Sequence, residues 1–323
     1  MTYAASASHA ILRLRAQLLA EIRAFFAARN VLEVETPALS SAGVSDLALD
    51  SVLATVRRLG TAPYYLQTSP EYAMKRLLAS GSGDIYQICR VFRDDELGRW
   101  HQPEFTLLEW YRQGWDEQLL MDEVDELLTQ LLQARPERIR KPTLRMTYAD
   151  AFREYLHADA GGDPAAIVRR LTELRIDVPA GLARDGLLDL AVSTAIAPRF
   201  AADALTLIYD YPANQAALAR IKAQTPPVAA RFEVFAGGLE LANGFAELTD
   251  AAEQRRRFAA ELDERRRAGR HQPPLDEDFL AALERGLPAC AGVAVGVDRL
   301  VAVAAGVDTL ADAVSFAHRP LHG

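Results

Sequence analysis

The chain has very little cysteine and no long hydrophobic run. Only two of its 323 residues are cysteines, Cys89 and Cys290, which are too few for a disulfide framework. No stretch approaches the roughly 18 consecutive apolar residues that a membrane-spanning helix requires. Residues 1–26 place charged side chains among the apolar ones, so no signal peptide is expected. These absences predict a cytoplasmic protein that does not enter a membrane.

An excess of basic residues is also missing. The formal net charge at pH 7 is −8, whereas affinity for nucleic acid comes mainly from Lys and Arg side chains that neutralise phosphates. A general nucleic-acid surface is therefore not expected. The chain has no GxxxxGK[ST] loop, and no GxGxxG run between a strand and a helix, so a nucleotide would have to be held in another way.

Residues 86–112, YQICRVFRDDELGRWHQPEFTLLEWYR, are the most informative stretch. Two runs rich in aromatic and β-branched residues flank a charged segment, which predicts a strand, a long functional loop and a returning strand. Arg93 stands where the first strand meets the loop, and an arginine there can clamp a phosphate through its planar donors. Arg99 and His101 follow in the loop. A long solvated hairpin with scattered charges is the alternative interpretation.

Two other segments each join a helix and a strand. Residues 10–29 have apolar residues at helical spacing, and the strand VLEVETPALS follows, closed by Pro37. In YYLQTSPEYAMKRLLASG, Ser69 can cap a helix and Pro70 suits its first position. Glu71 lies in the first turn, where the helix dipole favours a carboxylate. The dipole alone explains Glu71, and a contact with substrate is the alternative.

The middle of the chain is less informative. Residues 116–205 read mostly helical, and their acidic residues are assigned no chemistry. Strands are predicted in ALTLIYDYP and on both sides of Gly237 and Gly238. Asp250 then opens a capped helix. Its arginine clusters indicate a solvated face or, alternatively, a docking surface for an acidic protein.

The last unit, PACAGVAVGVDRLVAVAAG, predicts a strand followed by an apolar helix. Gly292 and Gly296 allow close approach of the backbone. Asp298 and Arg299 precede the helix, and form either a buried structural pair or part of a site.

Two carboxylates recur in LELANGFAEL. Glu240 and Glu247 lie seven residues apart, and an extended or bulged segment can direct both into one cavity. Paired carboxylates that face a triphosphate favour Mg²⁺, which prefers oxygen ligands and commonly bridges phosphates.

These segments resemble the motifs of the class II aminoacyl-tRNA synthetases, in the form of the lysyl-tRNA synthetase subgroup. Residues 10–37 resemble motif 1, RVFRDDELGRWHQPEFTLLEWY resembles motif 2, and GVAVGVDRL resembles motif 3. The resemblance implies an α+β fold, a mainly antiparallel sheet flanked by helices. It implies one catalytic domain over residues 1–323, with a helical insertion within about 116–205. Motif 1 usually forms a dimer interface, which implies a homodimer; packing within one subunit explains the same pattern.

The resemblance also implies the roles of individual residues. Arg93 would contact the α-phosphate of ATP, and Arg299 the far phosphates or the adenine face, as the two catalytic arginines. The other implied ATP-binding residues are Asp94, Asp95, Gln102, Glu240, Leu241 and Gly296. The implied Mg²⁺ ligands are Glu240 and Glu247. The implied contacts of the amino acid are Ser69, Pro70, Glu71, Tyr111, Glu247 and Ala294. Amino-acid activation needs no general base, because the attacking carboxylate is already ionised, so positioning and charge neutralisation suffice.

Within the subgroup, the chain closely resembles the enzymes that lysylate elongation factor P. Lysyl-tRNA synthetases carry an N-terminal anticodon-reading domain, whereas the motif 1 helix begins here near residue 10, so anticodon-dependent tRNA binding is not expected. The resemblance implies ATP-dependent activation of (R)-β-lysine and its transfer to a lysine ε-amino group of elongation factor P. Ala294 replaces the middle glycine of GxGxGxDR, and we infer that its methyl group reshapes the pocket near the substrate's amino group.

Two departures concern the adenosine contacts. The chain reads Asp94-Asp95-Glu96 where the family usually has Asn-Glu-Glu, and Gln102 stands in place of asparagine. Glu96 can compensate for the shorter carboxylate at position 95.

Two other functions stay open. One is a truncated lysyl-tRNA synthetase-like ligase that acts on tRNA or another acceptor, and the other is a non-catalytic regulatory paralogue.

Overall fold

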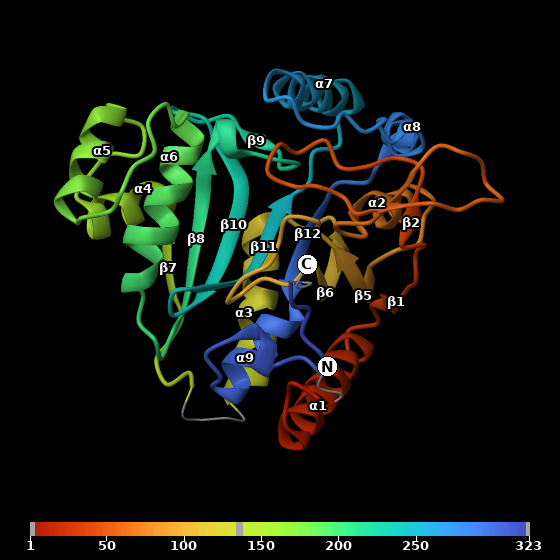
Figure 1. Ribbon diagram of the computed structural model, residues 1–323, viewed down its shortest axis with the longest axis horizontal. Helices are drawn as coiled ribbons and strands as arrows, with labels where there is room; N and C mark the ends of the chain where they lie inside the picture. Colours follow the sequence, from red (N-terminus) through yellow and green to blue (C-terminus); the bar gives the residue numbers. More distant parts are fainter. Residues whose placement is uncertain (1–3, 134–137, 321–323) are drawn as a thin grey trace. The chain divides into compact units, whose positions relative to one another are not determined.

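The structure is a computed structural model that describes residues 4–133 and 138–320 (Figure 1). Its contacts divide the chain into two compact units. The first unit comprises Met1–Gly114, Thr249–Cys290 and Ala294–Gly323, and the second Trp115–Leu248 and Ala291–Val293. The expected helical insertion falls wholly in the second unit. A single catalytic domain stays a prediction.

The first unit opens with helix α1 (His9–Ala27), as predicted, and Ser8 caps it by accepting a hydrogen bond from Ile11 N. The prediction of one continuous strand after this helix is wrong. The structure has two short strands there, β1 (Leu32–Glu33) and β2 (Leu39–Ser40). Pro37 lies between them and has no N–H group for a ladder. β1 pairs in parallel with β5, whereas β2 pairs with β4 in a separate sheet of order β2-β4-β3.

The predicted strand, loop and returning strand are confirmed. β5 (Ile85–Phe92) and β6 (Glu104–Gln113) pair antiparallel, from Ile85↔Tyr111 to Phe92↔Glu104. The remaining elements of this unit are β3 (Leu53–Ala54), β4 (Tyr64–Leu66), α2 (Glu71–Ala79), α7 (Ala251–Arg267), α8 (Glu277–Gly286), α9 (Val297–Ala305) and the 3₁₀ turn η5 (Leu310–Asp312). β12 (Cys290–Gly296) contributes residues to both units.

Aromatic rings join α2 to the two helices α7 and α8. Tyr72 stacks on Phe279 of α8 at 4.8 Å between ring centres and lies 5.6 Å from Phe258 of α7. The prediction that the arginines of α7 are solvated is wrong for Arg265, of which only 2% is exposed. Its guanidinium donates to the carbonyl oxygens of Asp46, Leu49 and His271, so backbone oxygens replace water.

The second unit combines helices with a mostly antiparallel set of strands. Its strands are β7 (Leu144–Thr147), β8 (Leu205–Pro212), β9 (Ile221–Lys222), β10 (Val228–Ala236) and β11 (Leu239–Ala246). Its helices and helical turns are α3 (Glu117–Gln133), α4 (Tyr148–Ala151), η1 (Phe152–Leu156), α5 (Pro164–Glu173), α6 (Arg184–Ala191), η2 (Val192–Ile196), η3 (Ala197–Arg199) and η4 (Ala213–Gln215). The strand order is β11-β10-β8-β7, with β9 on β10.

Strand β7 was not predicted, because the run of four residues is too short to show an alternating pattern. It pairs in parallel with β8, and the green helices α4, α5 and α6 lie beside these strands (Figure 1). Buried apolar side chains such as Phe152, Ile167, Leu188 and Ile208 fill the space between them. Since most pairings in both units are antiparallel, the predicted α+β class is confirmed.

The two cysteines are both free. Cys290 is buried, whereas Cys89 is only partly buried, and its Sγ accepts a hydrogen bond from Gln67 Nε2 at 3.6 Å. None of the helices in the described ranges combines the length and apolar character that crossing a bilayer needs.

Candidate functional site

Arg93 lies at the start of the loop between β5 and β6. Its backbone N–H donates to Pro103 O at 2.9 Å, which closes the base of the loop. Its guanidinium carbon lies 5.0 Å from the centre of the Phe105 ring, and Nη1 donates to Glu96 Oε1 at 3.0 Å. Its Nε atom is buried without a hydrogen-bond partner in the part of the chain that the structure describes. A cation with a spare buried donor suits an anionic oxygen such as that of a phosphate.

Arg299, in the first turn of α9, faces the far end of the same loop. Its Nη2 lies 2.9 Å from His101 Nε2, and its Nε donates to Trp100 O at 3.3 Å. Burial, then the charges of Arg299 and Arg93, lower the pKa of His101, so the imidazole is neutral at pH 7. The structure therefore brings both predicted catalytic arginines to one loop. Asp298 forms its own pair with Arg15.

Two side chains predicted near adenosine have protein partners in this structure. Asp95 is 69% exposed and accepts a hydrogen bond from Arg270 Nη2 at 2.8 Å. Gln102 is buried, and its Oε1 accepts from the backbone N–H of His318 at 2.7 Å. These contacts hold the shape of the loop, and the adenosine roles stay predictions.

The backbone of Asp94 contacts Asp50, which belongs to a cluster of opposite charges. Its N–H donates to Asp50 O at 2.9 Å, and Arg265 and Arg270 both bind the Asp50 carboxylate. Although burial acts in the opposite direction, the hydrogen bonds from the two arginines lower the pKa of Asp50. The first limb of the loop is therefore anchored on an ionised carboxylate.

The returning limb of the loop contacts the C-terminal segment 308–318. Arg99 Nε donates to Asp308 O at 2.6 Å, and Leu310 N donates back to Arg99 O at 2.9 Å. Arg99 therefore fastens the loop to this segment.

A buried polar network joins α2 and β6. Glu109 is 2% exposed, and its carboxylate accepts hydrogen bonds from Ser69 Oγ and Tyr111 Oη, both at 2.7 Å. Ser69 Oγ also accepts from the N–H of Glu71 at 3.1 Å. Lys75, with no exposed surface, donates to Glu71 Oε1 at 2.5 Å. The structure thus gathers Ser69, Glu71 and Tyr111, predicted from two separate segments, around Glu109.

Glu109 has an unusual acidity. Burial, followed by the charge of Glu71, raises its pKa to about 7, against hydrogen bonds from Tyr111 and Ser69 and the charge of Lys75. A buried carboxyl group that ionises near neutral pH is suited to receive an ammonium group. Sequence reasoning missed both Glu109 and Lys75 as site residues. The signal was available, because Glu109 shares a strand face with Tyr111 and Lys75 follows Glu71 by one helical turn.

Three predicted residues lie at the edges of these elements. Pro70 is the N-cap of α2, so the helix begins one residue later than predicted. Ala294 and Gly296 lie in β12 and are partly buried. A Cβ atom at Gly296 would lie 3.7 Å from Arg299 Cδ, an ordinary contact, so the glycine leaves space beside this side chain.

In the second unit, Glu240 in β11 and Glu247, one residue past its end, fall on one face of the extended segment. The pairing with β10 passes from Val234↔Ala242 to Phe235↔Glu240, so the buried Leu241 is the extra residue of a β-bulge. A bulge shifts the alternation of side chains by one position, which aligns residues seven apart. The bulged segment of the sequence analysis is therefore observed, although Glu247 itself follows the end of β11.

The same two carboxylates are the candidates for a metal. Across residues 4–133 and 138–320, no group of three or more His, Cys, Asp or Glu side chains could hold a metal ion. Mg²⁺ commonly takes only one or two protein carboxylates, together with phosphate oxygens and water. Two carboxylates on one strand face fit this donor set, and the Mg²⁺ site stays a prediction.

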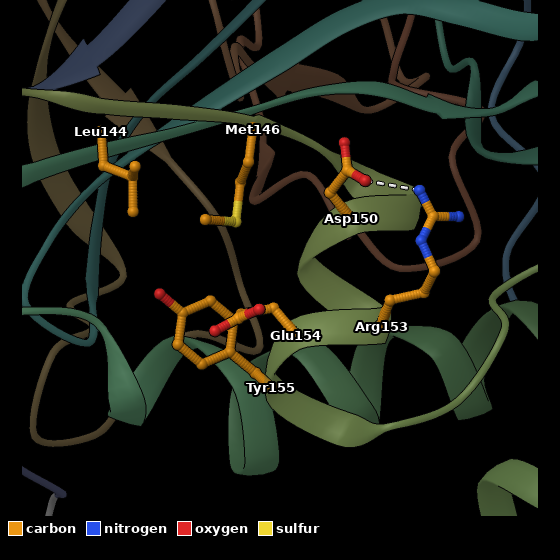
Figure 2. A pocket seen from close by; sticks show the side chains of 6 residues that line it. All are labelled: Leu144, Met146, Asp150, Arg153, Glu154 and Tyr155. Atoms are coloured by element: carbon orange, nitrogen blue, oxygen red, sulfur yellow. Dashed lines mark hydrogen bonds and ion pairs between the residues drawn. The ribbon is translucent and has the colours of Figure 1, made fainter.

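A pocket in the second unit lies away from all these residues in the sequence. Figure 2 shows its lining, which is Leu144, Met146, Asp150, Arg153, Glu154 and Tyr155. Asp150 and Arg153 form an ion pair with each other. None of the predicted site residues lines it, and we assign it no chemistry.

The chain is similar to proteins of known families over almost its whole length. A family model described as "tRNA synthetases class II (D, K and N)" matches residues 1–320. Proteins named elongation factor P–(R)-β-lysine ligase from Salmonella gallinarum, Salmonella paratyphi B and Salmonella heidelberg are each 46% identical to it over 323 residues. The match covers 98% of this chain and 97% of each relative.

Proposed function

The chain belongs to the class II tRNA synthetases of the aspartate, lysine and asparagine group, and from this premise we propose that it is an (R)-β-lysine ligase. It activates (R)-β-lysine with ATP and transfers the β-lysyl group to a lysine ε-amino group of elongation factor P. The observation that carries the proposal is the 46% identity, along 98% of the chain, to relatives named for this activity.

In the first step, a carboxylate oxygen of β-lysine attacks the α-phosphorus of ATP. The bond from that phosphorus to the bridging oxygen breaks, pyrophosphate leaves and an acyl-adenylate forms. Arg93 and Arg299 neutralise charge on the phosphates, and no side chain has to remove a proton from the carboxylate. Mg²⁺, held by Glu240 and Glu247, would supply further positive charge at the phosphates. Asp94, Asp95, Gln102, Leu241 and Gly296 complete the proposed ATP contacts.

In the second step, the neutral ε-amino group of the acceptor lysine attacks the acyl carbon. The acyl–phosphate bond breaks, AMP leaves, and loss of a proton from nitrogen gives the amide. The two ammonium groups of β-lysine need acidic partners in a buried site. The network of Glu71, Glu109 and Tyr111 binds one, and Glu247 is proposed for the other.

We further propose a cytoplasmic homodimer. Its interface is formed by α1 and β1, the counterparts of motif 1, where Leu32 leaves 55% of its surface exposed. Light scattering should give the mass of two chains, and Leu32→Glu should shift it towards one. The two free cysteines suit a reducing compartment.

The deciding experiment is mass spectrometry of elongation factor P after incubation with the protein, ATP and each lysine isomer. We expect a mass gain of one β-lysyl group, strongest with (R)-β-lysine and absent without ATP. Charging of total tRNA with lysine, and no change of elongation factor P, would favour the tRNA-type ligase. Absence of amino-acid-dependent pyrophosphate exchange with every isomer would favour the regulatory paralogue.

A further inference from the structure

The network around Glu109 contains a lysine for which the two proposed chemical steps have no role. Lys75 has no exposed surface. Its Nζ lies 2.5 Å from Glu71 Oε1, one helical turn away, and 5.8 Å from the centre of the Phe279 ring on α8. A buried ammonium group is costly unless it is paired, and an apolar side chain would fill the same space without that cost. The charge itself therefore needs an explanation.

The charges around Glu109 nearly balance. From α2, Glu71 raises the pKa of Glu109 and Lys75 lowers it. On β5, burial and then the charge of Glu109 raise the pKa of the Cys89 thiol to about 12, so it is neutral. The hydroxyl groups of Ser69 and Tyr111 donate to Glu109. The network therefore pairs Lys75 with Glu71, and Glu109 adds a carboxyl group that is part protonated at pH 7.

We propose that Lys75 is a positioning residue of the amino-acid site, whose ammonium group fixes Glu71 and leaves Glu109 to receive one ammonium group of the substrate. This inference rests on the proposed function. With a substrate ammonium bound, two carboxylates face two cations and the buried charge is zero. Without Lys75, two neighbouring carboxylates would face one cation in a medium of low dielectric constant, and would share a proton instead.

The arrangement couples binding to pH. Since Glu109 is part protonated at pH 7, an arriving ammonium group displaces its proton, and the KM for the amino acid should fall as the pH rises through about 7. Loss of the charge of Lys75 should raise the pKa of Glu109 further, and move this fall to higher pH. A lysine that only packs, and whose charge does not act on Glu109, would not move it.

The test compares Lys75→Gln, which removes the charge but keeps a donor for Glu71, with Lys75→Arg, which keeps the charge. Pyrophosphate exchange from pH 6 to 9 gives the KM for (R)-β-lysine and for ATP. For Lys75→Gln we expect a midpoint about one pH unit higher, with a KM for β-lysine about tenfold higher at pH 7 and an almost unchanged KM for ATP. Lys75→Arg should restore the midpoint. The matched control is Lys141→Gln, which removes an exposed lysine paired with Asp203.

A midpoint in Lys75→Gln equal to that of the unmodified protein overturns the inference, as does an equal rise in both KM values. A second measurement needs no substrate. Carboxyl ¹³C resonances of labelled glutamate, with Glu109 assigned through Glu109→Gln, follow its ionisation directly. If the protein activates no lysine isomer, the proposed function fails, while the Glu109 titration in Lys75→Gln still decides the role of Lys75.

Discussion

The buried network around Glu109 and the loop between β5 and β6 hold their charges in opposite ways. In the network, Lys75 and Glu109 expose 0% and 2% of their surface. In the loop, the side chains of Arg93 and Glu96 expose 26% and 23%, and that of Asp95 69%. Water screens the loop pairs, so they exchange for phosphate at little cost, whereas the network is preorganised and sensitive to any missing charge. Under the proposed function, the amino-acid side would therefore be built in advance and the nucleotide side adjustable.

The largest effect should come from removing a cation of the loop. Arg299→Ala should reduce pyrophosphate exchange on the order of 10³-fold or more, because charge on the leaving phosphates loses its partner. Urea denaturation of the variant shows whether the loss of activity occurs in a folded protein. Arg267→Ala on the exposed face of α7 is the control. A loss of less than tenfold would count against the assignment.

In the buried network, removing the cation should mainly lower the stability of the fold. Lys75→Met should lower the free energy of unfolding by about 2–4 kcal/mol, because it leaves Glu71 without its cation. The value stays below that of a wholly buried pair, since the Glu71 side chain is 16% exposed. Urea denaturation measures it. A change below about 0.5 kcal/mol would mean that the network is as tolerant as the loop.

The raised pKa of Glu109 predicts the direction in which stability changes with pH. Burial raises the pKa of Glu109 to about 7 from its ordinary 4.5, so the folded state keeps a proton that the unfolded chain releases. The stability that this provides is complete below about pH 4.5 and is lost as the pH rises through 7. Glu109→Gln, which stays neutral, should gain stability over the unmodified protein from pH 5 to pH 8. Thermal melts across this range check it, and a constant difference contradicts it.

Substrate choice should respond more weakly. Ala294→Gly removes one methyl group and should shift the ratio of kcat/KM values towards α-lysine by about tenfold, as is usual for small apolar changes in a pocket. Pyrophosphate exchange with both isomers measures the ratio. An unchanged preference would show that this methyl group does not read the position of the amino group.

The smallest effect is expected for the exposed ion pair of the loop. Asp95→Asn removes an ion pair with Arg270 whose acidic side chain is 69% exposed. Its effect on the free energy of unfolding should stay within about 0.5 kcal/mol in urea denaturation. A larger loss would show that the loop is fastened as firmly as the network.

Local patterns were enough to predict the parts that carry the site. Aromatic and β-branched runs predicted β5 and β6, and the Ser-Pro-Glu sequence predicted the start of α2 to within one residue. The seven-residue spacing of Glu240 and Glu247 allowed either an extended or a bulged segment, and it could not decide between the two. The grouping of Ser69, Glu71 and Tyr111 was implied by the family resemblance.

Long-range partners could not be predicted in the same way. Arg270 lies 175 residues from Asp95, and His318 lies 216 residues from Gln102. A helix rich in arginine is predicted to be solvated, whereas the carbonyl oxygens of a distant loop and the Asp50 carboxylate make it possible to bury Arg265. The raised pKa of Glu109 likewise depends on how completely its neighbours exclude water, which cannot be predicted from residue spacing.

The way in which the chain threads through its two units has a consequence for synthesis. It leaves the first unit at Gly114 and returns at Thr249, whereas the second unit is continuous except for Ala291–Val293. On the ribosome, Arg15 must therefore wait for Asp298, and Asp50 for Arg265, until the final quarter of the protein emerges. Until then the apolar side chains of the first unit lack part of their cover, and transiently exposed apolar surface of this kind favours aggregation.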